Sequence, residues 1–361
     1  MTNLAKSRIL LAAAALALTV VSIISPSDGA QDPARLAARS AKLTETSVSG
    51  ISSGAYMAGQ FQFVHGEIVV GAAIIAGGPY GCAESVFADI MSGPGMMLFN
   101  MSKAVNGCML NMLSMFGIPD PKGLARRAKT LAERGDIAPL ETVRKSRVYL
   151  FSGKADTFVM PEIVAAARDF YLEIGLPESQ LAYIHNMNAG HAFVTRDTGG
   201  ACANSAQPYI VDCDYDQAGA LLSHIYGKLA PRTAKPGGEF ITFDQGEFTR
   251  DLGDHGLAAS GSVYVPSTCR DGSGCRVHIA FHGCSQSRND VRDAFIKGSE
   301  LAEWSDNNRI IVLFPQVQSS VTNPQSCWDW WGYTGSGFLT KRAPQIIAVR
   351  RMLDRLTTTA N

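Results

Sequence analysis

The sequence has no net charge with which to attract a charged partner. Its 361 residues include 32 lysines and arginines and 32 aspartates and glutamates, so the formal charge at pH 7 is zero. Proteins that bind nucleic acid or anionic membranes through charge carry an excess of basic residues. The composition therefore argues against both partners and fits a neutral substrate. Hydrophobic residues make up 46% of the chain, which predicts a packed core.

Two motifs that would indicate other chemistry are also missing. The sequence contains no Cys-x-x-Cys pair, which argues against a zinc site and against thioredoxin-like redox chemistry. It contains no internal repeat, no low-complexity tract and, after residue 24, no apolar run long enough to span a bilayer. We therefore expect no metal or cofactor, and a reaction carried by the protein's own side chains.

Residues 1–30 have the layout of a secretory signal peptide. Lys6 and Arg8 precede an almost wholly apolar run over residues 9–24, and small or helix-breaking residues follow at 26–30. The run is shorter than the ~20 residues of a membrane-spanning helix. We expect cleavage near the end of this segment and export to the periplasm or the medium, with no membrane association afterwards. A retained anchor is the alternative.

Export makes the eight cysteines candidates for disulfide bonds, because an even number in an oxidising compartment favours pairing. Connectivity cannot be deduced from the sequence, but loop lengths favour pairing each cysteine with its neighbour along the chain. The expected pairs are Cys82–Cys108, Cys202–Cys213, Cys269–Cys275 and Cys284–Cys327.

Alternating strand and helix patterns predict an α/β fold with one mostly parallel sheet. The continuous apolar run at residues 68–75 is typical of a strand buried on both faces. We expect residues 31–361 to form one catalytic domain, with a connection near residue 232. Strands are predicted at 44–49, 68–75, 147–151, 181–185, 240–243, 262–265, 276–281 and 310–314, and helices at 55–64, 161–174, 217–229, 290–304 and 344–356.

One Gly-x-Ser-x-Gly motif occupies Gly50 to Gly54. Such motifs often arise by chance, but here a predicted strand precedes it and a predicted helix follows it. This strand–turn–helix context is typical of a nucleophile elbow. The glycines allow the tight turn, and the helix N-terminus favours developing negative charge. The pattern predicts that Ser52 is a nucleophile.

A serine nucleophile needs a base, and the base needs an acid that orients it. In α/β hydrolases the acid and then the histidine follow the serine, each in a loop after a strand. Asp156 and His191 satisfy this order. Asp156 also has the alternative interpretation of a helix N-cap. His282 is the other histidine at a strand end in a Gly-rich turn, but its context, FHGC, resembles an oxyanion loop, in which the histidine is a scaffold residue.

The predicted oxyanion hole has its parts far apart in the sequence. One donor is the backbone N–H after the nucleophile, here Ser53, and the other comes from a loop after an early strand. Here the matching loop, HGCSQS at residues 282–287, follows the histidine base. Circular permutation explains this order, because domain termini often lie close together. The N–H of Cys284 is the expected second donor, held rigid by a disulfide to Cys327.

The segment CWDWWGY, residues 327–333, is unusually rich in aromatic side chains. Aromatic residues at this density are more often core than ligand site. If Cys327 is bonded to the oxyanion loop, however, Trp328 lies beside the serine, where an apolar wall would suit a short aliphatic ester. We therefore rank Trp328 ahead of Trp330 and Trp331 as substrate-binding residues.

The stretches GISSGAYMAGQ, SGKAD, NAGHAF, FHGCSQS and CWDWWGY together resemble the poly(3-hydroxybutyrate) depolymerases with a permuted catalytic domain. The resemblance covers nearly all of the chain after residue 30. It implies a circularly permuted α/β-hydrolase fold and hydrolysis of esters in a short-chain polyhydroxyalkanoate polymer or its oligomers. It also implies that Ser52 is the nucleophile, Asp156 the acid and His191 the base. The backbone N–H groups of Ser53 and Cys284 would be the oxyanion donors, and Trp328 would line a monomer subsite.

One departure from the family concerns the end of the chain. Many members continue into a linker and a separate polymer-binding module. We expect no such module after the last predicted helix of this chain. We therefore do not expect tight adsorption to crystalline polymer. Members that act in the periplasm, on amorphous polymer or on oligomers are the better match.

Two other functions fit parts of the pattern. An exported esterase for feruloyl or acetyl groups of plant polysaccharide would use the same chemistry. A disulfide-stapled binding protein with a degenerate hydrolase fold would use none, and the complete set of triad candidates argues against it.

Overall fold

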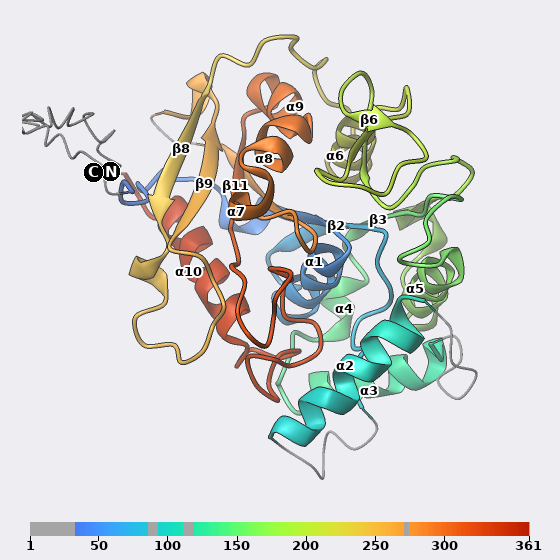
Figure 1. Cartoon of the computed structure of the whole chain (residues 1–361). Helices are drawn as coiled ribbons and strands as arrows, with labels where there is room; N and C mark the ends of the chain where they lie inside the picture. The colour runs from blue at the N-terminus through green and yellow to red at the C-terminus, as the bar shows by residue number, and fades with distance from the viewer. Residues whose placement is uncertain (1–32, 86–92, 111–118, 271–273, 361) are drawn as a thin grey trace, which may run out of the picture. The chain divides into compact units, whose positions relative to one another are not determined.

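An eight-stranded sheet organises the chain, as the alternating pattern predicts (Figure 1). The structure, a computed structural model, describes residues 33–85, 93–110, 119–270 and 274–360. The predicted signal peptide lies outside these ranges, and Pro33–Asn361 form one compact unit. Among the described residues, no helix has the length and apolar character that crossing a bilayer requires.

The spatial order of the strands is β4-β3-β2-β1-β10-β11-β9-β8. All neighbours pair in parallel except β11 with β9 and β9 with β8, which are antiparallel. The strands are β1 (Thr46–Ile51), β2 (Val69–Ile75), β3 (Arg147–Phe151), β4 (Leu181–Ile184), β8 (Glu239–Asp244), β9 (Ser260–Val265), β10 (Arg276–Phe281) and β11 (Ile310–Phe314).

Helices pack against this sheet, with α1 across β1, β2 and β10, and α6 across β2 and β3. The segments are α1 (Ser53–Val64), α2 (Pro94–Cys108), α3 (Pro121–Glu133), α4 (Leu140–Val143), α5 (Pro161–Glu173), α6 (Gln217–Tyr226), α7 (Arg288–Val291), α8 (Ala294–Gly298), α9 (Leu301–Asn308) and α10 (Pro344–Thr357).

Two local features differ from the sequence prediction. The single helix expected over residues 290–304 is three short ones, because Arg292 and Glu300 adopt left-handed backbone angles, with φ of 55° and 57°, that interrupt it. A small second sheet, in the order β5-β7-β6, was not expected. Its strands are β5 (Phe193–Thr195), β6 (Gly200–Ala201) and β7 (Ile210–Asp212), each too short to show an alternating pattern.

The strand order confirms the circular permutation. If the strands are numbered along the chain from β8 as the first, their spatial order becomes 1-2-4-3-5-6-7-8, in which β10 is strand 3 and β1 is strand 5. The beginning and end of the described chain also meet, since the N–H groups of Arg39 and Ser40 donate to the carbonyls of Leu356 and Thr358 at 3.1 and 2.9 Å. Joining these ends and opening the connection between α6 and β8 would restore the unpermuted order.

Four disulfide bonds join the eight cysteines, in the four pairs that the loop lengths favour. They are Cys82–Cys108, Cys202–Cys213, Cys269–Cys275 and Cys284–Cys327. Bonds of this number are typical of proteins that fold in an oxidising compartment.

Candidate active site

Ser52 lies in a sharp turn between β1 and α1. Its backbone has φ 57° and ψ −124°, a combination that few residues other than glycine adopt. The turn is held from both sides, because the Ser52 N–H donates to the carbonyl of Ile75 at 2.9 Å and the Ser52 carbonyl accepts from the N–H groups of Ala55 and Tyr56. The serine therefore stands at the carboxyl end of a central strand in a strained conformation.

The flanking glycines are required by close backbone contacts. A Cβ at Gly50 would lie 2.0 Å from the carbonyl oxygen of Gly54. A Cβ at Gly54 would lie 2.3 Å from the carbonyl oxygen of Phe281 and 2.4 Å from that of His282. The Gly-x-Ser-x-Gly pattern thus serves both the turn itself and its direct packing against the end of β10.

Asp156 and His191 form a buried pair in the loops after β3 and β4. The Nδ1 of His191 lies 2.8 Å from Oδ2 of Asp156, while Oδ1 accepts from the N–H groups of Phe158 and Val159 at 2.9 Å each. The Asp156 carboxylate therefore favours the tautomer with a proton on Nδ1, which leaves Nε2 free as a base. Asp156 is not the N-cap of α5, a position that Met160 occupies.

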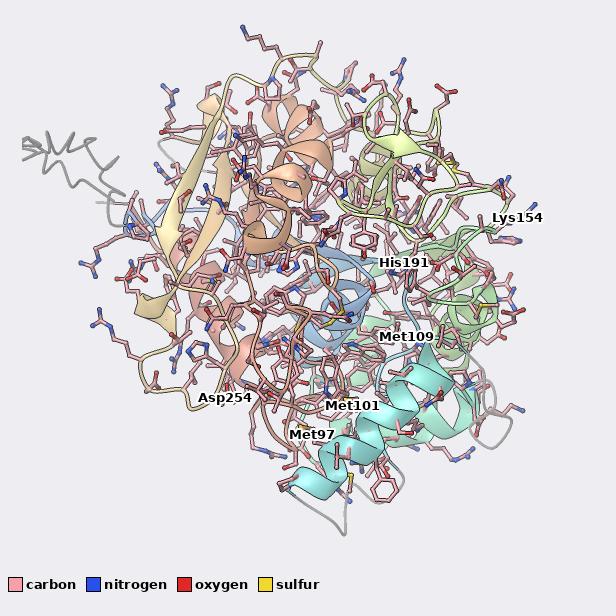
Figure 2. The ribbon with its side chains drawn as sticks, viewed as in Figure 1. Met97, Met101, Met109, Lys154, His191 and Asp254 are labelled. Atoms are coloured by element: carbon pink, nitrogen blue, oxygen red, sulfur yellow. A yellow bond between two sulfur atoms is a disulfide. The ribbon has the colours of Figure 1, made fainter. Side chains whose placement is uncertain are left out.

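The parallel strands bring these residues to one edge of the sheet. β1, β2, β3 and β4 are consecutive parallel neighbours, so their carboxyl ends lie along the same edge. Ser52, Asp156 and His191 each follow one of these strands, and all three side chains are buried. Figure 2 labels His191 among the side chains of the compact unit. The backbone N–H of His191 donates to Oγ of Ser205 at 2.7 Å, which fixes the loop that carries the imidazole.

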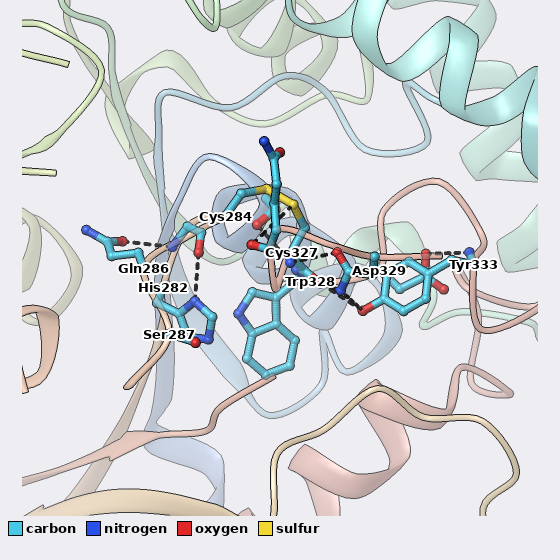
Figure 3. Close-up of a disulfide and its surroundings, with 12 residues drawn as sticks. His282, Cys284, Gln286, Ser287, Cys327, Trp328, Asp329 and Tyr333 are labelled. Carbon is cyan, nitrogen blue, oxygen red and sulfur yellow. Dashed lines mark hydrogen bonds between the residues drawn. A yellow bond between two sulfur atoms is a disulfide. The ribbon is translucent and has the colours of Figure 1, made fainter. Parts of the chain in front are cut away.

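The loop after β10 lies against the serine. A Cβ at Gly283 would lie 3.4 Å from Cβ of Ser52. The imidazole of His282 donates from Nδ1 to the carbonyl of Gly283 at 2.7 Å (Figure 3). It accepts at Nε2 from the N–H of Val317 at 3.3 Å. Burial lowers the pKa of His282 to about 4, so the ring is neutral at pH 7 and has the one donor and one acceptor that these bonds need.

His282 consequently fixes the peptide plane that carries the N–H of Cys284. That N–H and the carbonyl of Gly283 belong to the same peptide group, so a bond to one orients the other. Within the described residues, neither the N–H of Cys284 nor that of Ser53 donates a hydrogen bond to another protein group. Two backbone donors near Ser52 are therefore left for a ligand.

The Cys284–Cys327 disulfide connects this loop to the tryptophan-rich segment (Figure 3). Asn323 holds Cys327 through two hydrogen bonds, from the Cys327 N–H to Oδ1 at 2.9 Å and from Nδ2 to the Cys327 carbonyl at 2.8 Å. The N–H of Trp328 donates to Oγ of Ser53 at 3.3 Å. The segment is thus attached both to the oxyanion loop and to the first residue of α1.

The tryptophan side chains lie in the interior rather than on an open wall. Trp328 is completely buried, with its ring edge-on to Phe281 at 4.9 Å between centroids. Trp330 stacks on Tyr56, with ring centroids 4.0 Å apart, and Trp331 packs edge-on against Trp330. The indole N–H groups of all three find no partner within the described part of the chain.

Asp329 holds the turn of this segment together. Its carboxylate accepts from the N–H groups of Gly332, Tyr333 and Thr334 and from the Thr334 hydroxyl. Burial raises the pKa of Asp329, and these hydrogen bonds oppose that effect. The side chain therefore acts as a buried anchor for the backbone of residues 329–334.

Several neighbours of the site carried no sequence signal. Phe158 is 40% exposed, and its ring centroid lies 5.2 Å from that of His191. The ring of Tyr209 is edge-on to His191, with 6.4 Å between the ring centroids. Ser205 and Gln286 support the two functional loops through side-chain hydrogen bonds. The position of Gln286 inside HGCSQS was the one clue available in the sequence.

With the strands numbered from β8, the strained serine turn follows strand 5 and a His-Gly loop follows strand 3. This arrangement is that of a circularly permuted α/β hydrolase. Among known proteins, the chain is 37% identical over 319 residues to a poly(3-hydroxybutyrate) depolymerase from Delftia acidovorans. This match covers 87% of the chain and 60% of the relative, so the chain spans less than two thirds of that protein's length. A polyhydroxybutyrate depolymerase from Talaromyces funiculosus is 31% identical over 309 residues, with 80% of the chain and 83% of the relative covered.

Solved structures agree with these matches. The crystal structure of the PHB depolymerase from Penicillium funiculosum gives a TM-score of 0.78 at 28% identity, and a serine-to-alanine variant of a PHB depolymerase complexed with an R3HB trimer gives 0.79. Each covers 91% of the chain and all of the solved protein. No protein-family model matches the chain. The chain belongs to the poly(3-hydroxybutyrate) depolymerase family, as the sequence motifs predict.

Proposed function

We propose that the protein is an exported serine esterase that hydrolyses the ester bonds of poly(3-hydroxybutyrate) or its oligomers through an acyl-enzyme. The observation that carries this proposal is the buried His191–Asp156 pair on the same sheet edge as the strained turn of Ser52. The family membership supports the substrate class, since one structural neighbour is complexed with an R3HB trimer. The four disulfides support export, to the periplasm or the medium.

The proposed reaction has two halves. Ser52 Oγ attacks the ester carbonyl while Nε2 of His191 takes its proton, and Asp156 stabilises the imidazolium that forms. The negative oxygen of the tetrahedral intermediate is stabilised by the free N–H groups of Ser53 and Cys284. The imidazolium then protonates the leaving alkoxide, which departs as the hydroxyl end of the polymer. A water molecule, deprotonated by His191, releases the acid and restores Ser52.

The tryptophan-rich segment, residues 327–333, supplies the apolar side chains for a substrate subsite in this proposal. We propose that the tryptophan segment, with Trp328, Trp330 and Trp331, borders the subsite for the acyl chain through its attachment to Ser53 and Cys284. In support, the described structure joins Trp328 to Ser53 by a hydrogen bond and Cys327 to Cys284 by a disulfide. Because Trp328 is fully buried, its role is to support the residues that border this subsite. Trp330 and Trp331 are slightly more exposed than Trp328.

The experiment that tests this function measures release of 3-hydroxybutyrate from amorphous granules, crystalline polymer and soluble oligomers. The wild-type protein is expected to release it, and Ser52→Ala is expected to lose about three orders of magnitude or more in turnover. A feruloyl ester assayed in parallel serves as the competing substrate. Faster hydrolysis of the feruloyl ester, or undiminished activity of Ser52→Ala, would contradict the proposal.

A further inference from the structure

A single buried amide side chain connects the oxyanion loop to the loop that supports the histidine. Gln286 is 1% exposed and lies between β10 and α7. Its Oε1 accepts from the N–H of Gly283 at 2.8 Å (Figure 3). Its Nε2 donates to the carbonyls of Pro208 and Tyr209 at 2.9 and 3.2 Å. Both ends of the amide are therefore engaged, each with a different loop.

The loop on the Nε2 side supports His191 through two hydrogen bonds that it accepts from the backbone of residues 191–193. Ser205 accepts the N–H of His191 at 2.7 Å. The carbonyl of Tyr209 accepts the N–H of Phe193, two residues after the histidine, at 2.8 Å. The backbone over residues 205–209 consequently fixes the position of the imidazole, and Gln286 is bonded to that backbone.

The loop on the Oε1 side carries the free N–H of Cys284. Gln286 holds the N–H of Gly283, while His282 holds the carbonyl of the same residue. Both peptide groups of Gly283 are thus restrained, and the second of them includes the Cys284 N–H. Both loops contain a strained residue that neighbouring contacts must hold in place. Ser285 has a left-handed φ of 52° in the HGCSQS loop, and Tyr209 has a left-handed φ of 56° in the loop that supports His191.

We propose that Gln286 is a positioning residue that sets the separation between the oxyanion donor of Cys284 and the imidazole of His191. This inference rests on the proposed esterase function. In the tetrahedral intermediate the N–H must face the negative oxygen while the imidazolium faces the leaving oxygen, so the two loops must hold one relative position. A misplacement of about 1 Å costs on the order of 100-fold in rate, and the loss of one oxyanion donor costs about 100- to 1,000-fold.

The test compares Gln286→Met with Gln62→Met. Methionine keeps the length of glutamine and removes its strong hydrogen bonds. Gln62 is a matched control, because it is fully buried, accepts from the hydroxyl of Tyr171 at 2.6 Å and donates to Oγ of Ser146 at 2.7 Å. Both ends of its amide are therefore engaged, and its partners lie outside both functional loops.

The measurements are kcat and KM on a hydroxybutyrate trimer and on p-nitrophenyl butyrate, the inhibition constant of a trifluoromethyl ketone, and the thermal midpoint. For Gln286→Met we expect kcat to fall about 10- to 100-fold, with KM within about threefold of wild type. The ketone forms an oxyanion on Ser52, so its inhibition constant should rise in parallel. Gln62→Met should lower the midpoint by a similar amount and leave kcat within about twofold.

Equal losses of kcat in the two variants would show a general folding effect and would overturn the proposal, as would a Gln286→Met enzyme whose kcat is unchanged.

If Gln286→Met does not fold, Gln207→Ala tests the proposal instead. Gln207 is exposed and donates from Nε2 to the carbonyl of Ser285 at 2.8 Å, a second bridge between the same loops. Its loss should lower kcat about threefold, and an unchanged kcat overturns the proposal. A wild-type protein that hydrolyses p-nitrophenyl butyrate but not the trimer contradicts the proposed substrate and leaves this comparison intact.

Discussion

The two halves of the sheet supply different kinds of group to the site. The half from β1 to β4 carries Ser52, Asp156 and His191, which are side chains that can exchange protons. The half from β10 to β8 carries the HGCSQS loop, whose contribution in the proposed mechanism is the backbone N–H of Cys284, held in place by His282, Gln286 and a disulfide. In that mechanism the first half provides the reactive side chains and the second half a fixed hydrogen-bond donor, so the seam between β1 and β10 must keep them aligned.

That seam contains a buried polar network where an apolar contact would be usual. On β10, His278 lies between two serines of β1, with Nδ1 at 2.6 Å from Oγ of Ser47 and Nε2 at 2.8 Å from Oγ of Ser49. Ser47 also accepts from the hydroxyl of Tyr226 at 2.7 Å. A one-residue slip between these strands would break both imidazole bonds. The network therefore specifies the register that places Ser52 beside the HGCSQS loop.

The largest expected effect comes from removing the proton acceptor in the first half. His191→Ala is expected to lower kcat by about 1,000-fold or more, because Ser52 then has no base. The midpoint of thermal unfolding should change little by comparison, since the site sits at the edge of the sheet. Steady-state kinetics on p-nitrophenyl butyrate and a melting curve measure the two quantities. Activity within tenfold of wild type would remove His191 from the mechanism.

The next effect concerns the disulfide that braces the second half. Cys284 and Cys327 are 43 residues apart, so chain entropy predicts a loss of about 4 kcal/mol on removing the bond. The Cys269–Cys275 bond, with a separation of 6, is the matched control and should cost about 2 kcal/mol. We expect the double serine variant at 284 and 327 to lose about tenfold in kcat as the oxyanion loop loosens. The control should keep its kcat, and equal kinetic losses would contradict the division of roles.

The sequence was sufficient to predict the main elements of the fold. Apolar runs such as residues 69–75 gave the strands, and Gly50 and Gly54 gave the serine turn, because each signal is local. The order of the motifs also predicted the permutation. The breaks at Arg292 and Glu300 were missed because nothing local demands a left-handed backbone there.

The supports of the candidate site were harder to predict. Gln286 contacts backbone groups 77 and 78 residues away, and Ser205 contacts one 14 residues away. Contacts between a side chain and a distant backbone group leave no periodic pattern. The interior position of Trp328 likewise follows from packing on Phe281, which the segment itself does not reveal.

The seam gives a pH-dependent prediction. Burial lowers the pKa of His278 to about 3, well below its unfolded value near 6.5. The unfolded chain therefore binds a proton that the folded chain excludes, and the contribution of this residue is full above pH 6.5 and declines as the pH falls. His278→Asn should cost about 2 kcal/mol at pH 7. The stability difference between the two proteins should shrink by about 2 kcal/mol at pH 5. Urea unfolding at both pH values measures it, and a constant difference would refute the neutral imidazole.

The smallest expected effect separates the site from the apolar surface around it. Phe158 is 40% exposed and its ring lies 5.2 Å from that of His191, whereas Leu98 lies on α2 and is 55% exposed. Phe158→Ala should raise KM for a hydroxybutyrate trimer about threefold, because a half-exposed ring contributes on the order of 1 kcal/mol of apolar contact. Leu98→Ala, which removes a similar exposed apolar area, should leave KM on the soluble trimer unchanged. Both variants should unfold at the wild-type temperature, since neither side chain is in the core. An equal rise in KM for the two would mean that the trimer is held by a general apolar surface, and that Phe158 has no particular role beside the imidazole.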